Sequence, residues 1–178
     1  MNALQHNRPG ERGGEGDIMI RKIYLASSWR NPMQPQAVQI LRDAGHEVYD
    51  FRNPAPGNTG FAWSEIDPDW LNWTPQRFIE ALAHPIAAHG FTFDKSGLDW
   101  CDTCVLLLPC GKSAHLEAGY AIGQGKPTLA VLHTDRFEPE LMYLLAGSPS
   151  CVVPDLSRML EGLDALPYYT AEQCCREE

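Results

Sequence analysis

The segment "DTCVLLLPCGKSAHLEAGYAIGQGKPTLAVL", residues 102–132, gives the clearest indication of the fold class. Its opening "DTCVLLLP" is almost continuously apolar, which is typical of a strand buried on both faces of a parallel sheet. A helix is expected to follow, and "PTLAVL" at its end indicates a second strand. Four residues of this helix are expected to pack against the sheet: Leu116, Ala118, Tyr120 and Ile122. Two strands joined by a helix predict an α/β fold.

The same alternation of strand and helix runs through the rest of the chain. "KIYLAS" and "HEVYDF" indicate strands, and "PQAVQILRDAG" between them indicates a helix that Gly45 closes. A short helix is expected near "PELMYLLAG", a strand at "CVVP" and a last helix from Asp155. We therefore predict a single-domain flavodoxin-like (Rossmann-like) α/β fold. Its five-stranded parallel sheet is expected to have the order 2-1-3-4-5, with helices on both faces.

The expected domain occupies residues 19–170. Residues 1–18 are polar and rich in glycine, a composition that forms no core, so we expect a disordered tail there, and Met19 is a candidate start. Residues 171–178 are expected to form a second polar tail.

Residues 52–92 are interpreted as an insertion into this domain. The first part is rich in proline and glycine yet holds three tryptophans, which indicates a lid or a binding loop. Thr74 is expected to cap a helix that begins at Pro75. A short helical piece is expected near Asp94, before the strand at 102–109.

Charge and hydropathy indicate which partners the chain has. With 14 basic and 23 acidic residues the net charge is -9, which disfavours a nucleic acid polymer and leaves small molecules as the expected ligands. No apolar run reaches the roughly 18 residues that span a membrane, and no signal peptide is visible. We expect a cytoplasmic protein without membrane contact.

The cysteines allow two interpretations. Cys101, Cys104 and Cys110 belong to a zinc site, or they pack in and around a buried strand. Packing is favoured because no fourth ligand has suitable spacing, so we expect no metal and no other cofactor. Cys174 and Cys175 are expected to be exposed thiols.

Small and polar residues follow the first and third strands of the predicted sheet. Ligands of such sheets bind at the carboxyl ends of the strands where strand order reverses, so "ASSWRNP" and "PCGKSAHLE" are expected to meet in one crevice. Ser28 and Arg30 are candidate anion ligands, although an ordinary surface turn explains them equally well. Gly111, Lys112 and Ser113 lie at a helix N-terminus, which attracts phosphate.

Glu117 lies near the same helix start, where it is either a solvated helix residue or a carboxylate in the crevice. A carboxylate held there can attack an electrophilic carbon, such as C1 of a nucleotide sugar. An acid is then needed to protonate the departing base. Among Asp94, Asp99 and Asp102, Asp94 is best placed to reach the crevice from a flexible loop, although each is more often a cap or a solvated residue.

Two segments resemble the nucleoside 2-deoxyribosyltransferase superfamily, and within it the deoxynucleoside 5'-monophosphate N-glycosidases. They are "IYLASSWR" and "LEAGYAIGQGKP". The resemblance implies that Glu117 is the nucleophile, that Tyr24 orients it and that Asp94 is the assisting acid. It further implies a phosphate site made by Ser28, Arg30, Gly111 and Ser113.

The resemblance also implies the substrate class and the assembly. Nucleoside-specific transferases carry an acidic residue six positions before the nucleophile, where this chain has Gly111, which favours a phosphorylated substrate. A neighbouring subunit commonly completes the site in this superfamily, so a homo-oligomer with a shared active site is expected. Hydrolysis and transfer to a second base remain alternatives, as do a non-catalytic nucleotide sensor and cleavage of a larger nucleotide such as NAD. Trp63, Trp70 and Trp73 either stack on the base or pin the long loop.

Overall fold

The computed structural model describes residues 19–134 and 138–168 and contains a parallel sheet with the predicted strand order, β2-β1-β3-β4-β5. The strands are β1 (Lys22–Ala26), β2 (Glu47–Tyr49), β3 (Thr103–Leu107), β4 (Thr128–Val131) and β5 (Val152–Val153). The order reverses between β1 and β3, which confirms the predicted point of reversal. The predicted tails, and with them Cys174 and Cys175, lie outside the described residues.

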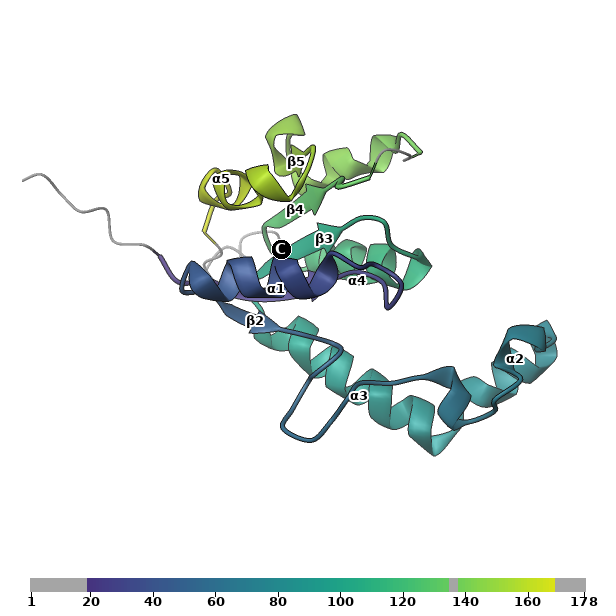
Figure 1. Cartoon of the computed structure of the whole chain (residues 1–178). Coiled ribbons are helices and arrows are strands. Elements are labelled where there is room, and N and C mark those ends of the chain that lie inside the picture. Colours follow the sequence, from purple (N-terminus) through teal and green to yellow (C-terminus); the bar gives the residue numbers. More distant parts are fainter. Residues whose placement is uncertain (1–18, 135–137, 169–178) are drawn as a thin grey trace, which may run out of the picture.

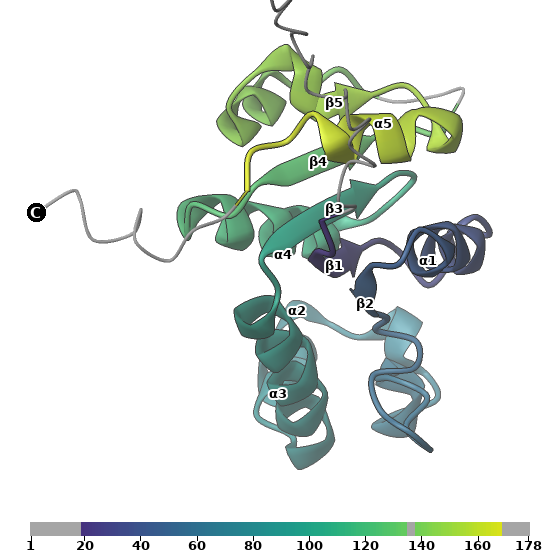
Figure 2. The same cartoon turned by 90° about the vertical axis from the view of Figure 1, so that its left-hand side faces the viewer.

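Helices cover both faces of the sheet, as predicted (Figure 2). On one face lie α1 (Gln34–Asp43) and α5 (Met159–Asp164), and on the other lie α3 (Pro85–Trp100) and α4 (Lys112–Gly123). Side chains of β1 alternate between the two cores: Ile23 and Leu25 face α1, whereas Tyr24 and Ala26 face α3 and α4. All five residues of β3 are buried, which confirms a strand covered on both faces.

The packing of α4 differs from the prediction. Ala114, Ala118 and Ala121 are its buried residues, whereas Leu116 is 75% exposed and Tyr120 is 37% exposed. The prediction that Leu116 and Tyr120 pack on the sheet was therefore wrong. Alanine at spacings of four and three residues lets the helix backbone approach the sheet closely, and the larger apolar side chains are turned outward.

The helix around Asp94 is much longer than predicted. A short helical piece was expected, but α3 is 16 residues long and begins inside the expected insertion. Its two internal glycines are sites of close packing, since a Cβ at Gly90 would lie 2.7 Å from Phe61 and one at Gly97 would lie 2.7 Å from Tyr49. Glycine has a low helix propensity, so two glycines do not indicate a long helix. The packing contacts that require glycine at these positions cannot be seen in the sequence.

The insertion extends away from the sheet, with α2 (Pro75–Leu82) and the N-terminal part of α3 at its far end (Figure 1). Thr74 caps α2 as predicted, because its Oγ1 accepts a hydrogen bond from the Arg77 N–H at 3.2 Å. Two 3-10 helices, η1 (Trp63–Glu65) and η2 (Trp70–Asn72), order the loop that precedes it. The proline-rich loop therefore packs against α3, where Phe61 contacts Gly90.

The C-terminal elements lie where they were predicted, and β5 is the expected strand, but the helices there are partly of the 3-10 type. The short helix is a 3-10 helix, η3 (Leu141–Ala146), and another, η4 (Pro149–Cys151), precedes β5. Asp155 caps a 3-10 turn, η5 (Leu156–Arg158), from which α5 continues. In the part of the chain that the structure describes, no helix is long and apolar enough to cross a membrane.

Candidate active site

A cleft of about 920 Å³ opens at the carboxyl ends of β1 and β3. Four predicted site residues line it: Arg30, Asp94, Ser113 and Glu117. They come from the β1–α1 loop, α3 and α4, three segments that are far apart in the sequence. The fold therefore brings half of the predicted site residues together in one cleft.

Glu117 is half-buried on α4 and faces this cleft, so it is not an ordinary solvated helix residue. Burial raises the pKa of its carboxyl to about 7, and the nearby Asp94 carboxylate adds to the rise, while the Tyr24 hydroxyl lowers it. Near neutral pH the group therefore exchanges readily between an ionised nucleophile and a neutral acid.

Tyr24 lies beneath the cleft on β1 and is completely buried. Its hydroxyl lies beside the Glu117 carboxyl but has no hydrogen-bond partner among the described residues. Burial, with the negative charges of Glu117 and Asp94, raises the pKa of this phenol far above its usual value. Tyr24 is consequently a neutral donor, and a buried donor without a partner is free to stabilise charge on Glu117 or on a ligand.

Asp94 reaches the cleft, as predicted, but it does so from α3 and not from a flexible loop. Its Oδ1 accepts a hydrogen bond of 3.0 Å from the Tyr49 hydroxyl. Burial raises the pKa of the Asp94 carboxyl, and the hydrogen bond from Tyr49 partly offsets this rise. A rigid helix thus holds the second carboxyl near the first, which favours retention of one proton by the pair.

The β1–α1 loop is fastened by side chains that the sequence interpretation did not single out. Asn31 is completely buried and donates to Ser27 Oγ at 3.1 Å, while Ser27 Oγ donates to the Leu107 carbonyl at 2.9 Å. One guanidinium nitrogen of Arg52 donates to the carbonyls of Ser28, Trp29 and Asn31. An arginine just after the second strand was a weak signal, because nothing in sequence spacing brings it back to the first loop.

The predicted phosphate ligands are only partly brought together. Arg30 lines the cleft, but the Ser28 hydroxyl accepts a hydrogen bond from the Arg30 N–H at 3.1 Å and does not line it. Gly111 is the N-cap of α4, and neither it nor the exposed Lys112 lines the cleft. Ser113, in the first turn of α4, does line it. The structure therefore assembles Arg30 and Ser113 and leaves Ser28, Gly111 and Lys112 outside.

Aromatic side chains form the outer wall of the cleft. Its aromatic lining consists of Trp29, Phe51, Phe61, Trp63, Trp70 and Phe91. Trp73 does not line the cleft, since its indole N–H donates to Asp67 at 2.7 Å and its ring packs on Trp63. Trp73 therefore anchors the loop, whereas Trp63 and Trp70 line the cleft.

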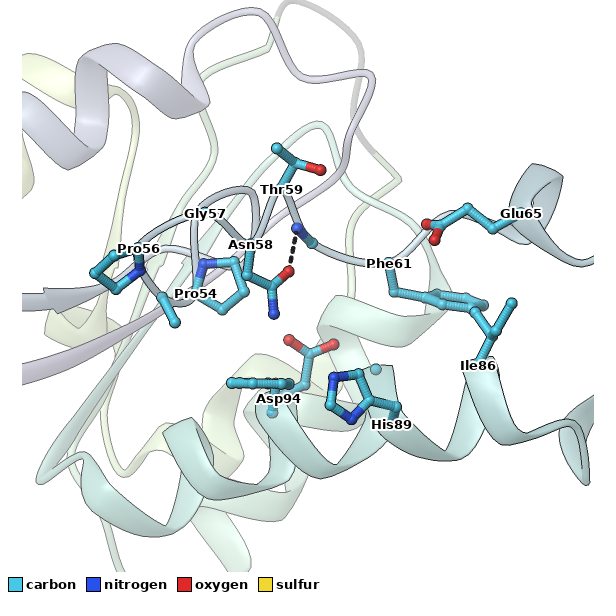
Figure 3. Close-up of a pocket in the computed structure, with 14 residues that line it drawn as sticks. Pro54, Pro56, Gly57, Asn58, Thr59, Phe61, Glu65, Ile86, His89 and Asp94 are labelled. Carbon is cyan, nitrogen blue, oxygen red and sulfur yellow. Dashed lines mark hydrogen bonds between the residues drawn. The ribbon is translucent and has the colours of Figure 1, made fainter.

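A second cavity of about 510 Å³ lies between the loop at 54–61 and α3. Asp94 and His89 face this loop across it (Figure 3). Phe61, Gly90 and Asp94 line both cavities, so Asp94 stands at their boundary. The larger cleft is the better candidate site because it alone also contains Glu117 and Arg30.

Other polar residues near α4 have structural partners. His115 Nδ1 lies 3.0 Å from the Gly111 carbonyl and Nε2 lies 3.2 Å from the Tyr143 hydroxyl, which links η3 to the start of α4. Cys101 and Cys104 are buried at and beside β3, as the packing interpretation predicts. Within residues 19–134 and 138–168, no three histidine, cysteine or acidic side chains are grouped so that they could hold a metal ion.

No protein-family model matches the chain. No curated protein matches it either. Among solved structures, it is similar to a 2-deoxyribosyltransferase from the psychrotolerant bacterium Bacillus psychrosaccharolyticus, with a TM-score of 0.53 and 19% identity over 85% of this chain and 94% of that one. A CMP N-glycosidase of Clostridium botulinum gives a TM-score of 0.43 and 16% identity over 80% of this chain and 97% of that one. The first similarity shows a shared fold, and the second is too low to support an argument.

Proposed function

We propose that this protein cleaves or transfers the N-glycosidic bond of a nucleoside 5'-monophosphate or nucleoside, with Glu117 as the nucleophile at C1 of the sugar. One observation carries the proposal: Glu117 and Asp94 share a cleft with Arg30 and Ser113, on a fold that a 2-deoxyribosyltransferase also has. Two carboxyls and an anion-binding end are what glycosidic cleavage of a phosphorylated substrate requires.

In the proposed reaction, the ionised Glu117 carboxylate attacks C1, and the electrons of the glycosidic bond leave with the base. A glycosyl-enzyme ester results, which water or a second base resolves. Tyr24, the buried hydroxyl beside Glu117, stabilises the carboxylate when it forms and when it is released again.

Asp94 supplies the proton to the departing base. Burial raises the pKa of the Asp94 carboxyl, which makes this group easier to protonate than an exposed aspartate, and the same burial keeps competing water away. Trp63 and Trp70 offer flat apolar surface on which the base can stack.

The phosphate is expected at the end of the cleft where Arg30 and Ser113 lie. An arginine pairs with phosphate through charge-assisted hydrogen bonds, and the N-terminus of α4 adds favourable dipole charge. This placement leaves the sugar between the phosphate end and the two carboxyls.

The test is chromatography of released base from a panel of ribo- and deoxyribonucleosides and their 5'-monophosphates, with and without a free acceptor base. Glu117→Gln is expected to lower the rate by at least about a hundredfold while ligand binding persists. Glu80→Gln, an exposed glutamate on α2, is the matched control and should leave the rate unchanged. Arg30→Ala should weaken turnover of a monophosphate by about 1–3 kcal/mol and that of the nucleoside far less.

The outcomes separate the alternatives. Base release without an acceptor indicates hydrolysis, and exchange only with an added base indicates transfer. If ligands bind and no base is released from any of them, the proposed reaction is refuted and a nucleotide-binding module remains. Equal weakening of monophosphate and nucleoside by Arg30→Ala would contradict the phosphate assignment.

We further propose that a second copy of the chain closes the cleft. Leu82, Phe91 and Leu116 line it and are nevertheless 53%, 68% and 75% exposed. They lie on α2, α3 and α4, and together they form an exposed apolar surface at the cleft mouth. Large exposed apolar side chains gathered at the mouth of a binding site are typical of a surface that a partner covers.

A further inference from the structure

Tyr49 is placed by the sheet directly beside Tyr24. The two residues are partners in the parallel pairing of β1 and β2, and their rings stack with centroids 5.1 Å apart and an angle of 10° between planes. Tyr24 is beside Glu117, whereas the Tyr49 hydroxyl donates to Asp94 Oδ1 at 3.0 Å. Each carboxyl of the site therefore lies beside a different tyrosine, and the two tyrosine rings stack on each other.

Gly97 holds the other side of the Tyr49 ring. It lies on α3 three residues after Asp94, and a Cβ built at this position would lie 2.7 Å from ring atoms of Tyr49. The absence of a side chain lets the ring lie against the helix backbone. Tyr49 is thus confined between Tyr24 and α3, which fixes the position of its hydroxyl relative to Asp94.

The hydrogen bond makes the two oxygens of Asp94 inequivalent. Oδ1 accepts from Tyr49, whereas Oδ2 accepts no hydrogen bond from any described residue, and Asp94 lines the cleft. An oxygen that already accepts a donor is the poorer site for the acid proton, so the proton of a neutral Asp94 belongs on Oδ2.

We propose that Tyr49 is a positioning residue that holds Asp94 so that Oδ2 carries the proton for the departing base. The inference rests on the proposed function. In the step, the Oδ2–H bond breaks and an N–H bond forms on the base, which leaves with the electrons of the glycosidic bond. Asp94 becomes a carboxylate, which the Tyr49 hydroxyl stabilises, and the C1–O bond to Glu117 forms at the same time.

Other titratable groups face Asp94 as well. Glu117 approaches from α4 and Tyr24 from β1. The negative charge of Asp94 raises the pKa of both groups. His89 lies on α3 and lines the second cavity with Asp94. Lys95, the next residue on α3, is paired with Asp99 at 2.6 Å. Tyr49 is the side chain in this group that donates a hydrogen bond to Asp94.

Tyr49→Phe tests the proposal, because it removes the hydroxyl and keeps the ring between Tyr24 and Gly97. We expect kcat to fall at least about tenfold with KM within about twofold, since the acid is misplaced and the binding surface is intact. Loss of a donor to the carboxylate raises the pKa of Asp94, so the pH above which kcat falls should move upward.

Tyr120→Phe is the matched control. Tyr120 also donates its hydroxyl to an aspartate of α3, Asp99, at 3.2 Å, but outside the cleft. It should leave kcat and the pH profile unchanged. Gly97→Ala is a second variant that keeps the Tyr49 hydroxyl but crowds its ring, and it should lower kcat in the same way as Tyr49→Phe.

A readout without turnover separates this inference from the proposed function. The pKa of the Asp94 carboxyl is measured by carbon NMR in the wild type and in Tyr49→Phe, with the Asp94→Asn spectrum for assignment. An upward shift in Tyr49→Phe, together with the loss in kcat, supports the proposal. An unchanged Asp94 pKa, or a normal kcat and pH profile in an active, folded Tyr49→Phe, overturns it. Absence of base release by the wild type with a shifted Asp94 pKa would instead refute the proposed function.

Discussion

Glu117 and Asp94 are two acidic side chains that face one cleft, and the charge of Asp94 makes ionisation of Glu117 harder. The pKa of Glu117 is about 7 because of burial and the charge of Asp94, and burial raises the pKa of Asp94 too. The proposed reaction needs one proton on the pair, with Glu117 ionised and Asp94 neutral. Loss of the last proton removes the acid, and a second proton removes the nucleophile.

The pH dependence of base release follows from this pair. We expect a bell-shaped profile in the wild type, with the alkaline limb near pH 7, where the pair loses its last proton. In Asp94→Asn the alkaline limb should vanish and the residual rate should rise to a plateau. Its midpoint should lie below 7, because the charge that raised the pKa of Glu117 is gone. Initial rates between about pH 4 and 10 check both statements, and a bell retained in Asp94→Asn would exclude Asp94 as the acid.

The residues that carry the proposed chemistry differ in how far the sequence predicts them. Glu117 and Arg30 belong to motifs of the chain that have a chemical interpretation by themselves, and both line the cleft. Tyr49 and Asn31 were not predicted, because each acts through a contact with another segment. A tyrosine in a strand is indistinguishable from any other β-forming residue until its hydroxyl has a partner.

At the scale of elements, α3 determines where Asp94 lies, and its C-terminus is held by a buried lysine. Lys126 is 6% exposed, and its Nζ donates to the carbonyls of Leu98 and Asp99 in the last turn of α3. A cation there satisfies carbonyls that have no partner within the helix and complements the negative end of the helix dipole. The segment "GQGKP" before β4 thus helps to hold the C-terminus of α3 in place.

Lys126→Met tests this contribution, because it retains the apolar stem and removes the ammonium. Loss of charge-assisted hydrogen bonds from a buried site should reduce the free energy of unfolding by about 1–3 kcal/mol. The midpoint of thermal unfolding then falls by about 2–4 °C for each kcal/mol. Lys22→Met, at an exposed position on β1, is the control and should change stability by less than about 0.5 kcal/mol. Equal midpoints for the Lys126 variant and the wild type would show that the cap is not needed.

Helix lengths and helix faces were the least predictable features. The sequence predicted only a short helical piece near Asp94, yet α3 is 16 residues long, and its glycines are points at which Phe61 and Tyr49 approach the helix. In α4 the apolar residues Leu116 and Tyr120 suggested the buried face, yet three alanines occupy it. Both errors have one cause. Glycine and alanine at these positions allow two elements to pack closely, and the pattern of residues along one element does not show how close its neighbour lies.

At the scale of the whole molecule, the exposed apolar side chains around the cleft form a surface that α2, α3 and α4 share. This surface is made of Leu82, Phe91 and Leu116, each of which is more than half exposed. Because this surface lies at the cleft mouth, a second copy of the chain that covers it would also close the proposed active site. Burial of each such side chain by a second copy would contribute about 1.5–3 kcal/mol.

Light scattering during size-exclusion chromatography tests the assembly. We expect the wild type to be a dimer or larger at micromolar concentration. Leu116→Glu should shift it toward the monomer and lower base release, because a buried charge without a partner opposes association. Ile20→Glu, at an exposed apolar position before β1, should alter neither. A monomeric wild type with full activity would contradict the proposed assembly.

Three features could be predicted from the amino-acid sequence alone: the sheet order, the strand buried on both faces, and the crevice that Glu117 and Arg30 line. These features follow from hydrophobic runs and from the rule that parallel strands present their carboxyl ends at one edge. The contacts of the folded chain were needed to show which tyrosine lies beside which carboxyl, why α3 contains glycine, and which predicted anion ligands stay outside the cleft. These depend on distances between segments that are remote in the chain, and side-chain spacing along one element contains no information on such distances.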